Sequence, residues 1–131
     1  MNREWMVVSN NPLVRDHTSS CTWVDGNFAD VLLKVRDLVY DGYKLITHPL
    51  PASIGMFYAP VRSIILAPDK SPDKSPDKSE QSMILIAEAI DQYRRTVRPD
   101  HPQKGSCVDY EMIDYDLWQQ SLSECRRGNF K

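Results

Sequence analysis

The stretch of sequence that decides the fold is residues 27–46, NFADVLLKVRDLVYDGYKLI. Its large apolar side chains recur every three or four positions, which is the spacing of one continuous stripe on a helix. These residues are Phe28, Val31, Leu32, Val35, Leu38 and Val39. Asn27 can cap the helix and Gly42 can end it, before a short apolar strand at 43–46. Because such a stripe must be buried, we expect this helix to pack on a sheet.

Three further apolar runs, at residues 5–9, 21–24 and 62–67, are also typical of strands. Together with the run at 43–46 they predict a sheet of about four strands. A strand, a helix and a strand follow one another between residues 21 and 46, which favours a right-handed crossover between parallel strands. The sequence therefore predicts a single three-layer α/β domain with a mostly parallel sheet and helices on both faces.

Three more helices are expected along the chain. A short helix should follow Asn11, a good N-cap, and Pro12, which fits the first helical turn. A second long helix should begin after Ser79 or Ser82, and a last helix should span about residues 110–126. The sequence leaves open whether this C-terminal helix packs on the domain or on a partner.

Two polar segments interrupt these elements. Residues 68–79 are three tandem copies of Pro-Asp-Lys-Ser without an apolar side chain, so we expect a mobile insert there. Residues 96–108 contain two prolines and a glycine, which is typical of a linker. We therefore divide the chain into an α/β domain over 1–98 and a linker with a C-terminal helix over 99–131.

Composition narrows the class of protein. The chain has 131 residues, a net charge of −2, 41% apolar and 26% charged residues, which is ordinary for a globular protein. It has no basic excess to attract nucleic acid, and no apolar run near the roughly 20 residues that span a bilayer. The N-terminus does not resemble a signal peptide. We expect a cytoplasmic protein that binds neither nucleic acid nor a membrane; its oligomeric state is open.

The residues that could hold a metal or a cofactor lack the required spacing. Cys21, Cys107 and Cys125 are odd in number and far apart, so they fit neither a disulfide framework nor a CxxC site. The three histidines form no metal-ligand pattern, and no glycine-rich nucleotide-binding motif is present. We expect free thiols, no metal and no cofactor.

Polar, proline-containing segments follow two of the predicted strands: SNNP at residues 9–12 and ITHPL at 46–50. In an open parallel sheet, ligands bind outside the carboxyl ends of the strands. Asn10 and Asn11 lie where free backbone N–H groups begin a helix, which suits a carboxylate or a phosphate. The alternative interpretation is a plain N-cap and turn.

His48 is the candidate for chemistry at the second strand end. A histidine there can act as a general base or bind an anion, and Thr47 and Ser53 can add hydrogen bonds. No spacing identifies a nucleophile and an orienting group beside it, so no catalytic residue is predicted. The alternative is a structural histidine bonded to the backbone.

Five segments, taken in order, resemble the GrdX family. They are residues 9–14 (SNNPLV), 30–38 (DVLLKVRDL), 45–50 (LITHPL), 62–66 (RSIIL) and 88–90 (EAI). This family comprises small proteins associated with the glycine, sarcosine and betaine reductase systems of anaerobic bacteria. The resemblance covers roughly residues 5–95, and the repeat and the tail beyond about residue 100 depart from the pattern.

The resemblance implies an association rather than a reaction, because the family's biochemical role is not established. It favours a non-catalytic accessory or binding protein whose partners are reductase components. The alternative is a small enzyme or sensor that binds a small anionic ligand, a carboxylate- or phosphate-bearing metabolite, at the carboxyl edge of the sheet. A third possibility is an oligomeric structural protein that uses the helix containing Trp118.

Overall fold

The computed structural model describes residues 5–68, 76–97 and 107–127. Four strands form one open sheet in the order β2-β1-β4-β3. The strands are β1 (Met6–Ser9), β2 (Cys21–Trp23), β3 (Tyr43–Leu45) and β4 (Ser63–Pro68). The helices are α1 (Pro12–Arg15), α2 (Phe28–Tyr40), α3 (Pro76–Thr96) and α4 (Cys107–Arg126), with a short 3₁₀ helix, η1 (Ile54–Tyr58). Each strand and helix predicted from the sequence is present.

The sheet is mixed, and the prediction of a mostly parallel sheet was wrong. β1 pairs in parallel with β2, but β4 pairs antiparallel with both β1 and β3. The cause is the segment between β3 and β4, which contains only η1. A parallel return needs a crossover, usually a helix, that carries the chain back to the opposite edge of the sheet. Without one, β4 begins at the edge where β3 ends.

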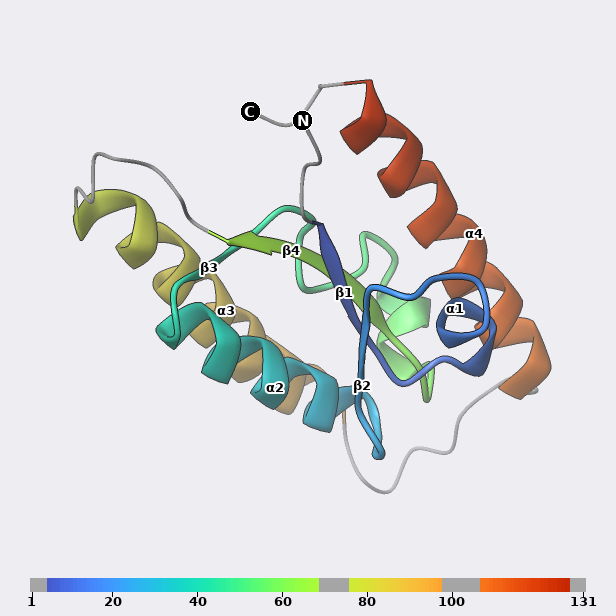
Figure 1. The fold of residues 1–131 in the computed structure, drawn as a ribbon. Helices are drawn as coiled ribbons and strands as arrows, with labels where there is room; N and C mark the ends of the chain where they lie inside the picture. Colours follow the sequence, from blue (N-terminus) through green and yellow to red (C-terminus); the bar gives the residue numbers. More distant parts are fainter. Residues whose placement is uncertain (1–4, 69–75, 98–106, 128–131) are drawn as a thin grey trace.

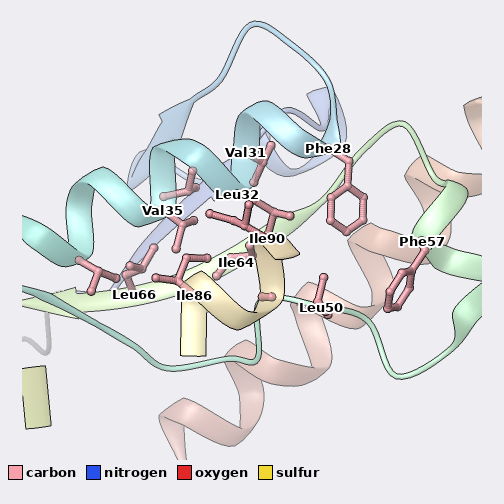
Figure 2. Close-up of a cluster of buried hydrophobic side chains, with 13 residues drawn as sticks. Phe28, Val31, Leu32, Val35, Leu50, Phe57, Ile64, Leu66, Ile86 and Ile90 are labelled. Atoms are coloured by element: carbon pink, nitrogen blue, oxygen red, sulfur yellow. The ribbon is translucent and has the colours of Figure 1, made fainter. Parts of the chain in front are cut away.

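Helices cover both faces of the sheet, as predicted. α2 and α3 lie together on one face, and α4 lies with α1 on the other (Figure 1). A large apolar core lies under α2 and α3, and Figure 2 shows its side chains meeting between these helices and the sheet. Leu50 and Phe57, from the segment between β3 and β4, close one end of this core (Figure 2).

The predicted capping of α2 is confirmed. The Asn27 side chain accepts a hydrogen bond from the Asp30 backbone N–H at 3.0 Å, and the Asp30 carboxylate accepts one from the Asn27 N–H at 2.9 Å. Gly26 leaves room for that carboxylate, because a Cβ there would collide with it. Past the other end of the helix, Gly42 has a φ of +110°, which other residues rarely adopt.

α4 packs on the sheet through a second, smaller core, which answers the question that the sequence left open. Trp118 and Cys125 of α4 are buried against Val7 and Ile65 of the two central strands, and Val14 of α1 joins them. The segment that we expected to be a linker and a C-terminal helix therefore contributes one of the three layers. Residues 98–106 of the linker lie outside the described residues.

α3 begins earlier in the chain than predicted, inside the Pro-Asp-Lys-Ser repeat. The third copy starts the helix at Pro76, and Pro at the first helical position costs no hydrogen bond. Ser82 is buried, and its hydroxyl accepts a hydrogen bond from the Leu45 N–H at 3.3 Å. Ser82 therefore joins α3 to β3 rather than capping the helix. Residues 69–75, where the insert was expected to be mobile, lie outside the described residues.

Candidate functional site

The two polar segments meet at one edge of the sheet. β1 and β3 both run opposite to β4, so the end of β1, the end of β3 and the beginning of β4 lie at this edge. Arg62 precedes β4 and joins the segments. Its guanidinium donates hydrogen bonds to the carbonyls of His48, at 2.7 Å, and Pro49, at 3.0 Å. Its backbone N–H donates to the Asn10 side chain at 2.8 Å.

Asn10 is used as a structural bridge. Besides accepting from Arg62, its amide nitrogen donates to the carbonyls of Gly26, at 2.9 Å, and Pro60, at 2.8 Å. These carbonyls belong to the loop before α2 and the loop before β4. The side chain is buried, and each of its polar atoms has a protein partner. Asn10 therefore ties three loops together at this edge.

Asn11 has the capping role predicted for it and a second role that was not predicted. Its side-chain oxygen accepts from the Leu13 N–H at 3.1 Å, which caps α1. Its amide nitrogen donates to the Glu111 carbonyl at 2.9 Å and to the Asp114 carboxylate at 3.0 Å, both on α4. The side chain is fully buried. Asn11 therefore links α1 to α4.

Asp114 collects the hydrogen bonds of this region, although it is only 1% exposed. One carboxylate oxygen accepts from the Ser63 N–H at 3.0 Å, and the other accepts from the Ser63 hydroxyl at 2.7 Å. The Ser63 hydroxyl is in turn 2.7 Å from that of Ser9, which also accepts from the Asn11 N–H at 2.9 Å. Because Ser63 donates to Asp114, Ser9 must donate to Ser63. We call Ser9, Asn11, Ser63 and Asp114 the Asp114 network.

The sequence interpretation missed Asp114 and Arg62. One signal for Asp114 was present: it lies four residues before Trp118 and so on the buried stripe of the helix. An acidic residue on a buried stripe needs partners, and these lie 51 and 103 residues away. Nothing in the sequence indicates which residues they are.

Two opposite charges are buried at this edge. Arg62 is 9% exposed, and burial lowers the pKa of its guanidinium, while the charge of Asp114 partly offsets that shift. Neither charge lacks hydrogen bonds, and in the described residues no buried side-chain nitrogen or oxygen is without a partner. A buried charge is tolerated when its hydrogen bonds are satisfied and an opposite charge lies nearby. The arrangement is therefore a satisfied polar junction within the fold.

The remaining candidates, Thr47, His48 and Ser53, lie on the outer side of the junction. The Thr47 hydroxyl accepts from the Ile65 N–H at 3.0 Å. His48 is exposed, and its Nδ1 lies 3.0 Å from the backbone nitrogen and 3.1 Å from the carbonyl oxygen of Leu50. Ser53 is exposed at the beginning of η1. The structure brings Asn10, Thr47 and His48 to one edge, joined through Arg62 and β4.

This arrangement assembles no general acid–base pair around His48. Among the described residues, its ring has no carboxylate, hydroxyl or thiol within hydrogen-bond distance. A recess lined in part by Thr47, Arg62 and Ser121 has a volume of about 20 Å³, which is room for roughly one water molecule. Residues 5–68, 76–97 and 107–127 also contain no group of three His, Cys, Asp or Glu side chains that could hold a metal ion.

Fold and site together define a small α/β protein with a mixed four-stranded sheet, whose carboxyl edge is closed by a buried polar junction. The chain belongs to the GrdX family: the family model described as GrdX-like protein matches residues 6–123. The match includes most of α4, and with it Asp114 and Trp118. No curated protein and no solved structure matches the chain. In the part of the chain that the structure describes, no helix has the length and hydrophobicity needed to cross a membrane.

Proposed function

We propose that the protein is a non-catalytic accessory or binding protein of a glycine, betaine or sarcosine reductase system. The observation that carries this proposal is the family match over residues 6–123. The family is associated with these reductase systems, so reductase components are the partners to test. The proposal assigns the protein a binding role and no reaction of its own.

The geometry at the carboxyl edge supports a binding role. The side chains of Asn10 and Asn11 form hydrogen bonds that hold loops and helices together. His48 is hydrogen-bonded within its own loop, and no acid or nucleophile among the described residues positions its ring. This edge therefore has the properties of a rigid scaffold. A carboxylate or phosphate ligand at Asn11 and His48, the alternative drawn from the sequence, stays a prediction.

The surface of α4 supports a protein partner. Four large apolar residues of this helix point outward: Val108 is 63% exposed, Met112 56%, Ile113 45% and Leu117 38%. Apolar side chains concentrated on one exposed element are typical of protein contact sites. We define this set as the outer surface of α4. We expect a reductase component to contact it, at the end that holds Ile113 and Leu117 beside the carboxyl edge.

We place the protein in the cytoplasm. Cys21 is a free thiol, and free thiols persist in a reducing compartment. The reductase systems to which the family is linked belong to anaerobic metabolism, which is consistent with this location.

The test is an affinity capture from an anaerobic extract that contains the reductase, read by mass spectrometry. The bait is the full chain, and the test variant is the double substitution Ile113→Glu with Leu117→Glu. The matched control is Ile84→Glu on α3, where the same kind of substitution is made at a side chain that is 56% exposed on the other face. A third bait, His48→Ala, removes the exposed ring at the carboxyl edge.

We expect the wild type and Ile84→Glu to recover reductase subunits, and the double variant to lose them. Loss with His48→Ala as well would extend the contact to the carboxyl edge. Recovery of no reductase subunit by any bait would contradict the accessory role. Far-UV circular dichroism of each bait shows whether it is folded, so that a misfolded variant is not counted as a loss of contact.

A further inference from the structure

A cleft opens at the other end of β1, away from the Asp114 network. Trp5, Met6 and Val7 line it from the beginning of β1, while Trp118 and Arg126 line it from α4. Figure 1 shows the last turns of α4 alongside the beginning of β1. The volume of the cleft is about 260 Å³. Ligand pockets for drug-sized molecules hold roughly 300–1,000 Å³, so this cleft suits a smaller metabolite.

The walls of the cleft divide into an apolar part and a polar part. Ile65, Trp118 and Leu122 provide apolar surface from β4 and α4. The hydroxyl residues Thr18 and Ser20 provide polar surface from the loop before β2. Such a division fits a ligand with an aromatic or short aliphatic body and a polar group at one end.

Among the described residues that line the cleft, Arg126 is the only charged one. It forms no ion pair within 4.0 Å with the rest of residues 5–68, 76–97 and 107–127. Its guanidinium can bind a carboxylate through two parallel hydrogen bonds. It also lies in the last turn of α4, where the negative end of the helix dipole disfavours a ligand with two negative charges more than a ligand with one. These two facts favour a monoanionic carboxylate over a dianionic phosphate.

We propose that this cleft binds a small carboxylate with an apolar body, its carboxylate group on Arg126 and its body against Trp118. The proposal does not depend on the reductase association, since it uses neither the outer surface of α4 nor the carboxyl edge. It assigns the protein a ligand site that the sequence interpretation had placed at the opposite end of the sheet.

Tryptophan fluorescence offers a direct readout. The chain has three tryptophans, and two of them, Trp5 and Trp118, line the cleft. The third, Trp23, pairs with Ser9 at the other end of β1 and is 38% exposed. The full chain carrying Trp23→Phe therefore reports on the cleft alone. The probe is phenylacetate, and phenylacetamide is its neutral isostere.

We expect phenylacetate to change the fluorescence saturably and phenylacetamide to bind at least about tenfold more weakly, as the loss of a charge-assisted contact implies. Arg126→Gln should weaken phenylacetate binding by a similar factor. Arg127→Gln is the matched control, because Arg127 is an exposed neighbour outside the cleft, and it should bind as the parent does. Ser20→Phe should abolish binding, because Ser20 lines the cleft and the larger ring would fill part of it.

Three results would overturn the proposal. They are the absence of a saturable change with phenylacetate, equal affinity for the acid and the amide, and equal loss in Arg126→Gln and Arg127→Gln. Isothermal titration of the same variants repeats the test without fluorescence. A thermal melt of each variant shows that it is folded. The reductase capture described above is unaffected by either result, so the two proposals can fail separately.

Discussion

The two faces of the sheet are held in different ways. On one face, α2 and α3 pack through a large apolar core, and Ser82 is a buried polar residue beside it. On the other, α4 buries few apolar side chains, chiefly Trp118 and Cys125, and adds the Asp114 network. The packing of α2 and α3 is stabilised by the apolar area removed from water, and this area changes little when a helix shifts slightly. The second face depends on hydrogen bonds of fixed geometry, which specify where α4 sits.

The largest effect is expected from Asp114→Ala. It removes the acceptor of three hydrogen bonds and leaves Ser63 and Asn11 with buried, unpaired donors; it also removes the charge that offsets Arg62. The loss in the free energy of unfolding should be about 3–5 kcal/mol. Urea denaturation measures it. Asp116→Ala, at an exposed position two residues along α4, should change stability by less than about 0.5 kcal/mol.

A comparable but purely apolar loss is expected from Leu32→Ala on the other face. Leu32 is 1% exposed in the core between α2, α3 and the sheet, so truncation leaves a cavity. The free energy of unfolding should fall by about 2–5 kcal/mol. The measurement is the same denaturation curve, with Lys34→Ala on the exposed side of α2 as the control. A loss below about 1 kcal/mol would mean that this face is not closely packed.

A smaller effect is expected at the beginning of α2. Asn27→Ala deletes the side-chain acceptor of the capping box, and with it the hydrogen bond to the Asp30 N–H. The free energy of unfolding should fall by about 1 kcal/mol, and Asn27→Ser should restore most of it, since Ser also caps helices well. Thermal denaturation of the three proteins measures this. Equal stability of Ala and Ser variants would contradict the role of the cap.

The smallest effect concerns Cys21, at the edge of the α4 face. Burial raises the pKa of this thiol, and the charge of Arg15 offsets the shift only in part. Because the pKa of the Cys21 thiol is higher in the folded protein than in the unfolded chain, the protonated thiol contributes to stability at a pH below the unfolded pKa. This contribution is lost as the pH rises through the folded pKa. Iodoacetamide should therefore label Cys21 more slowly in the folded protein than in urea. Equal rates between pH 7 and 9, followed by mass spectrometry, would contradict this.

The sequence predicted the elements because their signals are local. The stripe from Phe28 to Val39, the cap at Asn27 and the turn at Gly42 all lie within one helix and its ends, and each was confirmed. The strand directions were not predictable in the same way. They depend on whether the chain between β3 and β4 crosses the sheet, and only the structure shows that it does not.

The sequence predicted where the candidate site lies but not which residues form it. The two polar segments do lie at one edge, because the ends of β1 and β3 were placed correctly. The partners of Asn11 and Ser63 on α4 are more than 50 residues away, and no periodicity connects them. The cleft beside Arg126 was missed for a similar reason: its walls come from β1, β4, α4 and the loop before β2, and none of them has a motif.

The central claim is that the Asp114 network specifies the docking of α4, while the apolar core holds α2 and α3 on the other face. Hydrogen exchange of the wild type and Asp114→Ala, followed by mass spectrometry, tests it most directly. We expect the amides of α4 to lose protection in the variant while those of α2 keep it, because α2 packs in the apolar core on the other face of the sheet. Asp114→Asn, which keeps the shape and one acceptor oxygen, should lose less. Unchanged protection of α4, or an equal loss in α2 and α4, would contradict the claim.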